Sequence, residues 1–158
     1  MNYRMVWCQL ARLFLASCAV FFVGVSSTAS AGDVEALYKA AGDGDATKVT
    51  ALLESGADVN GRTATGSFAL NNAAVENHIE VIEILLGRGA DPNVQNIAGD
   101  TPLICATKYA GGKAATVKLL VDAGTNAALK DDDGMTALDY AKEKGQKEAV
   151  ALLENPGS

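Results

Sequence analysis

Residues 77–93, NHIEVIEILLGRGADPN, decide how this chain can fold. Apolar side chains recur here at helical spacing, namely Ile79, Val81, Ile82, Leu85 and Leu86. Glu80, Glu83 and Arg88 lie on the opposite side of the predicted helix. Gly89 is a candidate left-handed cap, where a Cβ is penalised, and Pro92 prevents the helix from continuing. The stretch therefore predicts a short amphipathic helix with its own stop signal.

The same pattern returns along the chain at a step of 33 residues, and once at a step of 35. Four apolar columns carry it: Leu37, Leu70, Leu103 and Leu138; Ala40, Ala73, Ala106 and Ala141; Val49, Ile82, Val117 and Val150; and Leu52, Leu85, Leu120 and Leu153. The two extra residues fall between Leu103 and Val117. A fixed period of this length indicates one helical unit stacked on copies of itself, which predicts an all-α solenoid.

Short motifs inside the period resemble those of ankyrin repeats. Residues 101–106, TPLICA, are similar to the TPLHxA signature of that family, and residues 89–93 and 56–60 resemble its GADxN turn. Residues 136–141, TALDYA, look like a last-repeat version. The resemblance implies helix-turn-helix units joined by short β-turn or hairpin fingers. It covers repeats at about 33–60, 61–93, 94–126 and 127–154, a domain of residues 32–154, with 155–158 as a C-terminal tail.

The second repeat departs from the family pattern. Residues 68–71, FALN, stand where TPLH is expected. In the family, the Thr and His of this motif tie the turn to neighbouring backbone. We expect Asn71 to replace the His and Phe68 to leave the Thr unreplaced, with the turn kept because Leu70 and Ala73 preserve the core columns. Asn72 is polar where an apolar residue is common, and we expect it to face the groove.

The first 31 residues have the order of a secretory signal peptide. Arg4 and Arg12 precede an apolar run from Leu13 to Val25, and Ala29-Ser30-Ala31 closes a small polar segment. This order predicts cleavage after Ala31. Two alternatives remain: residues 15–18, LASC, resemble a bacterial lipobox that would place a lipid on Cys18, and an uncleaved leader would anchor the chain in a membrane. The favoured location is periplasmic or secreted.

The charge balance indicates which partners suit the exported chain. Removal of residues 1–31 takes away two basic residues and no acidic one, which leaves 11 basic and 19 acidic side chains and a net charge of −8. Such a surface repels nucleic acid, because binding to phosphates needs many Lys or Arg contacts. A protein partner with a basic surface, or none, fits better, and solubility alone would also explain the charge. We expect a monomer that has no membrane contact after cleavage.

The candidate chemical groups are few, so no catalytic residue, metal or cofactor is predicted. After cleavage only Cys105 remains of the cysteines, and His78 is the only histidine. We expect Cys105 to be a half-buried apolar side chain and His78 to have a structural role, as in the ankyrin pattern. Residues 111–113, GGK, lack the rest of a phosphate loop, and residues 131–134, DDDG, do not match an EF-type calcium loop.

The resemblance implies a non-enzymatic module that binds proteins through its fingers and the concave groove of its first helices. Carried over by position, the predicted contact residues are Arg62, Thr65, Ser67, Gln95, Ile97, Asp100, Lys108, Tyr109, Lys130, Asp132 and Met135. Arg62, Ile97, Tyr109 and Met135 are the expected anchors. The sequence also resembles small exported bacterial ankyrin proteins, which implies an adaptor or helper. The alternatives are an inhibitor or immunity protein that blocks a toxin, and an enzyme using the loop near Gly111.

Overall fold

The computed structural model describes residues 30–155, which form eight helices joined by turns and contain no β-strand. The helices are α2 (Ala31–Asp43), α3 (Ala46–Glu54), α4 (Ala69–Glu76), α5 (Ile79–Gly87), α6 (Pro102–Lys108), α7 (Ala114–Asp122), α8 (Ala137–Glu143) and α9 (Lys147–Glu154). Each predicted repeat supplies two consecutive helices. The all-α prediction is therefore confirmed for the described residues, and the fingers are turns rather than stranded hairpins.

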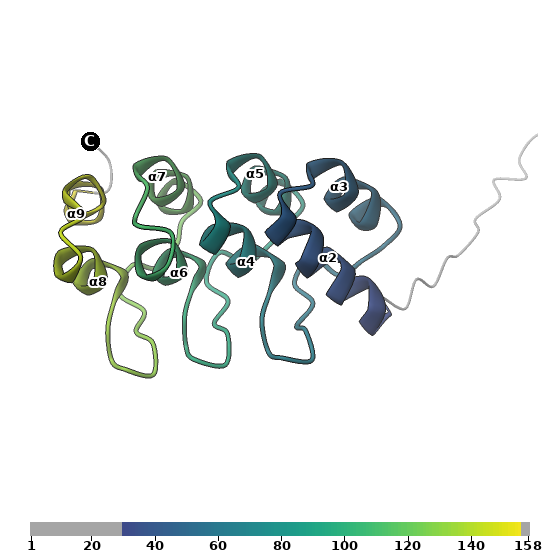
Figure 1. Cartoon of the computed structure of the whole chain (residues 1–158), viewed down its shortest axis with the longest axis horizontal. Helices are drawn as coiled ribbons and strands as arrows, with labels where there is room; N and C mark the ends of the chain where they lie inside the picture. The colour runs from purple at the N-terminus through teal and green to yellow at the C-terminus, as the bar shows by residue number, and fades with distance from the viewer. Residues whose placement is uncertain (1–29, 156–158) are drawn as a thin grey trace, which may run out of the picture.

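The helices lie in two parallel rows (Figure 1). The first helices of the repeats, α2, α4, α6 and α8, pack on one another in sequence, and the second helices, α3, α5, α7 and α9, do the same. The fingers project from the row of first helices, on the side away from the second helices (Figure 1). Each helix pair therefore buries its apolar faces against the pairs on either side, as in a solenoid.

One continuous core runs through the stack, and the predicted apolar columns form it. Leu37, Leu70 and Leu103 are buried, as are all four alanines of the second column. The three column members that are only partly covered, Leu52, Leu138 and Val150, all lie in the first or the last repeat. This gradient arises because an end repeat lacks one of its two neighbours.

Capping residues set where the first helices begin. Thr101 and Thr136 accept hydrogen bonds from backbone amides of α6 and α8, whereas Phe68 gives α4 no side-chain cap. For α2, the cap is Ser30, and Asp33 completes a capping box by accepting from the Ser30 amide at 3.1 Å. The helix consequently begins at Ala31.

Asparagine side chains tie α4 to its two neighbours. Asn71 donates to the backbone oxygen of Asp100 at 2.8 Å, so it takes the role expected of the family's His. Asn72 donates to the backbone oxygen of Tyr38 at 2.9 Å. The half-buried Asn72 thus bonds to α2, and its position at the groove stays a prediction.

The two inserted residues lie where the register predicted them. Five residues, 109–113, connect α6 to α7, whereas two residues connect α4 to α5 and three connect α8 to α9. Gly112 has a φ of 61°, and a Cβ there would come within 1.9 Å of the Gln146 side chain. The inserted loop therefore turns tightly over the start of α9.

The leader prediction falls on residues outside the described part of the chain, as does most of the predicted tail. Between residues 30 and 155, no helix has the length and apolar content needed to cross a membrane. Cleavage after Ala31 would remove the Ser30 cap from α2.

Candidate protein-binding surface

Three fingers of the same backbone design form one edge of the stack. They span residues 63–67, 96–100 and 131–135, and the amide of the first residue donates to the oxygen of the fifth at 2.9, 3.1 and 3.0 Å. The fourth residue is a glycine in each finger, with φ of 77°, 74° and 76°, a region that side chains with a Cβ rarely adopt. The repeats therefore present three copies of one tight turn.

A polar side chain closes each turn from inside. The Thr63 hydroxyl accepts from the Ser67 amide at 2.9 Å. Asn96 accepts from the Ala98 and Asp100 amides, and Asp131 accepts from the Asp133 and Met135 amides, at 2.9–3.0 Å. These local bonds satisfy amides that the turn leaves without a partner and hold each finger in shape.

Neighbouring fingers contact each other through their glycines. A Cβ at Gly66 would lie 1.9 Å from Cγ2 of Ile97, and a Cβ at Gly99 would lie 2.9 Å from the backbone of Asp132. The Asp132 amide also donates to the backbone oxygen of Ala98 at 3.0 Å. Each finger thus packs closely against the next, and the three turns form a continuous edge.

A hollow of about 550 Å³ lies between the first and second fingers. It is lined by residues 62–66 and by Ile97, whose side chain is 67% exposed. The Arg62 Nε donates to the Gly66 oxygen at 3.3 Å, which holds the guanidinium at the hollow. This hollow, termed here the Arg62–Ile97 hollow, combines one cation, threonine side chains and an apolar wall.

A charged cluster built on two buried aspartates joins the second and third fingers. Lys108 Nζ, at the end of α6, lies 3.1 Å from a carboxylate oxygen of Asp100 and 3.1 Å from one of Asp131. The Tyr109 hydroxyl donates to Asp100 at 3.3 Å, and the Tyr140 hydroxyl of α8 donates to Asp131 at 2.6 Å. These five residues are called the Lys108 cluster below. They connect two fingers to two helices.

The ionisation of the Lys108 cluster follows from these contacts. Burial raises the pKa of the Asp131 carboxyl, but hydrogen bonds from the Tyr140 hydroxyl and neighbouring groups outweigh burial and hold that pKa at about 2. Burial lowers the pKa of the Lys108 ammonium, whereas its polar partners, Tyr140 first, raise it above its usual range. Lys108 and Asp131 are therefore both charged at neutral pH. Their attraction holds the end of α6 against the third finger.

The structure exposes most of the predicted contact residues. Arg62, Thr65, Gln95, Ile97, Tyr109, Lys130 and Asp132 are exposed, and Ser67, Lys108 and Met135 are half-buried. Asp100 was predicted to be exposed but is 1% exposed, because its carboxylate accepts from Lys108 and Tyr109. Met135 packs partly on the core. Ile97 and Tyr109 are the large apolar side chains left exposed among the described residues.

Sequence reasoning missed Asp131 and Tyr140 as partners of Lys108. Asp131 belongs to the DDDG run, which was considered only as a calcium loop that it does not match. One feature of the sequence pointed to this contact: Lys108 is a single cation at the end of a first helix, and the neighbouring fingers contain several aspartates. The spacing of 23 and 32 residues from Lys108 gives no direct sign of contact.

The candidate chemical groups have structural partners. A ring nitrogen of His78 lies 3.0 Å from the Gly42 oxygen, which ties α5 to α2. Cys105 is 1% exposed, rather than half-buried as expected, and burial raises the pKa of its thiol to about 12. Such a thiol is a weak nucleophile at neutral pH. Within residues 30–155, no group of three His, Cys, Asp or Glu side chains could hold a metal ion.

Comparison with known families agrees with this architecture. A family model described as ankyrin repeats (3 copies) matches residues 9–96 and 70–158. The chain belongs to the ankyrin repeat family. Ankyrin repeat domains are in general non-enzymatic modules that bind other proteins, which is the class that this fold and surface define.

Individual relatives share the repeats but are much longer. The chain is 34% identical over 122 residues to the probable E3 ubiquitin-protein ligase XBOS33 of Oryza sativa subsp. japonica, which covers 75% of this chain and 23% of that protein. It is 33% identical over 112 residues to ankyrin repeat domain-containing protein 63 of Mus musculus, an alignment that covers 68% of this chain and 28% of that protein. The E3 ubiquitin-protein ligase Ufd4 of Drosophila melanogaster is 34% identical over 112 residues, an alignment that covers 68% of this chain and 4% of that protein. The chain thus spans less than a third of these relatives.

Proposed function

We propose that this protein is an exported ankyrin-repeat adaptor or helper that binds a protein partner with its finger edge and the groove of its first helices. The observation that carries the proposal is the Arg62–Ile97 hollow, since it places an exposed apolar side chain beside a held guanidinium. Arginine and aromatic residues are enriched among side chains that dominate binding energy. Tyr109 stands next to the second finger, because its hydroxyl bonds to Asp100.

The finger edge also favours a partner with a particular distribution of charge. Arg62 is the cation at the first finger, Ile97 is apolar at the second, and Asp132 and Asp133 are exposed at the third, with Asp133 76% exposed. A matching partner presents an acidic group, an apolar side chain and a basic group in that order. The excess of acidic residues supports a basic partner surface overall and argues against nucleic acid. We infer that the protein acts as a monomer.

Export is supported by the order of charge, apolar run and small residues in the first 31 positions. Intact mass after expression of the full chain in a bacterium, with separation of periplasm and cytoplasm, tests this part. A periplasmic product that begins at Gly32 is the expected result. A full-length product in the cytoplasm, or one bound to the membrane through Cys18, would overturn cleavage after Ala31.

The binding surface is tested with paired substitutions that leave the fold intact. Ile97→Ala with Tyr109→Ala removes the two exposed apolar anchors, and we expect partner affinity to fall at least tenfold. The melting temperature of Ile97→Ala alone should stay within about 2 °C, because an exposed side chain contributes little to stability. Tyr109→Ala also removes the hydrogen bond to the buried Asp100 and should lower the melting temperature further, so affinities are compared at a temperature at which both variants are folded. The partner is first identified by cross-linking in the native cell. Unchanged affinity in the double variant would show that another surface binds the partner.

A further inference from the structure

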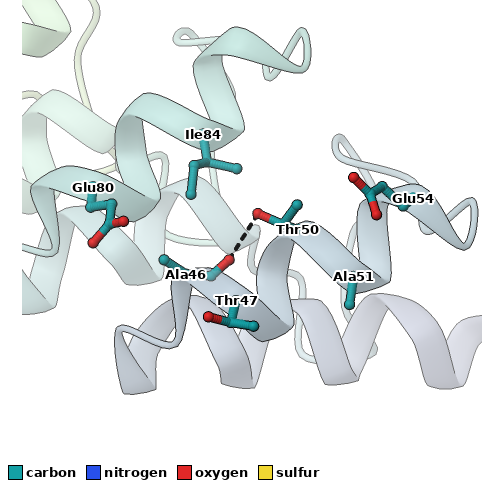
Figure 2. Close-up of a pocket in the computed structure, with 7 residues that line it drawn as sticks. All are labelled: Ala46, Thr47, Thr50, Ala51, Glu54, Glu80 and Ile84. Carbon is teal, nitrogen blue, oxygen red and sulfur yellow. Dashed lines mark hydrogen bonds between the residues drawn. The ribbon is translucent and has the colours of Figure 1, made fainter.

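A second hollow lies on the other side of the molecule, between the second helices α3 and α5. This α3–α5 groove, of about 430 Å³, is lined by Ala46, Thr47, Thr50 and Ala51 of α3, by Ile84 of α5, and by two carboxylates, Glu54 and Glu80. Figure 2 shows Glu80 beside Ala46 at one end, Glu54 at the other, and Ile84 between them. The row of second helices is the side away from the fingers (Figure 1).

The floor of the groove is mostly apolar, because alanines of α3 and Ile84 of α5 lie beside the two threonines. The Thr50 hydroxyl donates to the Ala46 backbone oxygen at 2.9 Å, so its proton is used within α3. Ile84 is only half-buried and leaves part of its side chain facing the groove. Small residues on α3 opposite a larger apolar residue on α5 produce a shallow trough.

The two ends of the groove are negatively charged. Glu80 is exposed in the first turn of α5, and Glu54 is the last residue of α3. Arg88 lies 3.4 Å from Glu54, but both side chains are well exposed, at 41% and 66%, and such pairs are weak. A cation from a partner can therefore compete for Glu54.

The spacing of the charges limits what can occupy the groove. Ala46 and Glu54 are eight residues apart on one helix, which corresponds to about 12 Å along its axis. A partner helix with basic residues at positions i and i+7 places them about 10.5 Å apart on one face. Long Lys or Arg side chains span the remaining distance, and an apolar residue at i+3 or i+4 then faces Ile84.

The other grooves of the same row lack this combination. At the positions of Glu54 and Glu80, the repeat register places Gly87 and Ala115 between α5 and α7. Between α7 and α9 the register restores acids, Asp122 and Glu148, but Lys118 replaces Thr50. Lys118 already pairs with Asp122 at 3.5 Å and adds a positive charge to that groove. The α3–α5 groove alone in residues 30–155 joins an apolar floor to two acids without a central cation.

We propose that the α3–α5 groove is a second docking surface, which binds a basic amphipathic helix of a protein partner through cations at i and i+7 and an apolar residue between them. This surface is separate from the finger edge.

A synthetic helix tests the proposal directly. The probe is a labelled, alanine-based peptide with Lys at i and i+7 and Leu at i+3 and i+4, titrated with the full chain at low salt. A control peptide of the same composition has its lysines at i and i+4. We expect the probe to bind at least fivefold more tightly than the control, and its affinity to fall at 0.15 M salt.

Matched variants assign the binding to the groove. E54Q/E80Q should weaken the probe at least fivefold, and A51K, which adds a cation to the floor, should do the same. D122N/E148Q, the same removal of two negative charges at the same register in the α7–α9 groove, should stay within twofold, as should I97A/Y109A in the finger edge. Melting temperatures confirm that each variant is folded.

Absence of probe binding to the parent chain would overturn the proposal. Equal binding of the two peptides, or an E54Q/E80Q variant that binds like the parent, would also overturn it, since attraction by net charge alone would then explain the result. Loss of peptide binding with I97A/Y109A would place the peptide on the finger edge instead.

Discussion

The first finger, residues 63–67, and the third, residues 131–135, share one backbone turn but have opposite surroundings. In the third finger the closing side chain is Asp131, which is buried and bonds to Lys108 and Tyr140. In the first finger the closing side chain is Thr63, and the turn borders the open Arg62–Ile97 hollow. The same turn is therefore bonded to neighbouring helices in the third finger, whereas in the first finger it forms one wall of an open hollow.

The two fingers differ in their surroundings because the first helices of the repeats end in different residues. Lys108 occupies the end of α6, and its register equivalents are Val75 in α4 and Glu143 in α8. Only a cation at this position can bridge the aspartates of two fingers. Polar side chains that already bond to one another inside the protein have few free donors or acceptors for a partner. Exposed residues without such bonds, such as Ile97, are therefore the better binding candidates.

The largest expected effect comes from breaking the Lys108 cluster. Lys108→Met leaves the buried carboxylates of Asp100 and Asp131 without their cation, and we expect the free energy of unfolding to fall by about 3 kcal/mol. Lys118→Met is the control, since its pair with Asp122 is exposed and is worth about 0.3 kcal/mol. Urea unfolding of both variants measures the difference. Equal losses would show that the cluster does not stabilise the third finger.

A smaller effect should appear at acid pH. The pKa of Asp131 is about 2 in the folded protein, below the usual value of about 3.9, so its ionised form stabilises the fold above pH 4. That contribution, about 2 kcal/mol, is lost as the pH falls from about 4 to 2. Unfolding free energies at pH 5, 4, 3 and 2 should therefore fall more steeply for the parent than for Asp131→Asn. Parallel curves for the two proteins would contradict the assignment.

The smallest expected effect is a difference in stability between alanine substitutions of the glycines in the first and third fingers, Gly66 and Gly134. Gly134→Ala meets open space, so it costs only the strain of a left-handed residue, about 1 kcal/mol. Gly66→Ala has the same strain and also collides with Ile97, so we expect a cost of about 2 kcal/mol and a displaced Ile97. Chemical denaturation compares the stabilities. Equal costs would mean that the first two fingers are less closely packed than described.

The repeated columns made the fold predictable from the sequence. Leu70, Ala73, Ile82 and Leu85 recur at a fixed period, and the same residues form the buried centre of the stack. Local chemistry was predictable too, because the structure gives Asn71 the expected bond to neighbouring backbone and leaves Phe68 without a side-chain cap. These features depend on short sequence separations or on a repeating register.

The site was predictable only in part, because it depends on which polar groups satisfy one another. Position in the family pattern predicted exposure correctly for Arg62 and Ile97. It failed for Asp100, whose burial depends on Lys108 eight residues later. The α3–α5 groove was missed because its residues are ordinary one by one, and only the packing of two outer helices brings Glu54 and Glu80 to the ends of one trough.

Photo-cross-linking from single positions in the native cell tests most directly whether the finger edge is the binding surface. A photoreactive residue replaces Ile97 beside the hollow, and in a second variant it replaces Ala151 on the exposed side of α9. The account predicts a discrete protein adduct from position 97 that is absent from position 151 and is lost when Arg62 is changed to Ala. Adducts of equal yield from both positions, or none from position 97 while position 151 cross-links a protein, would contradict it.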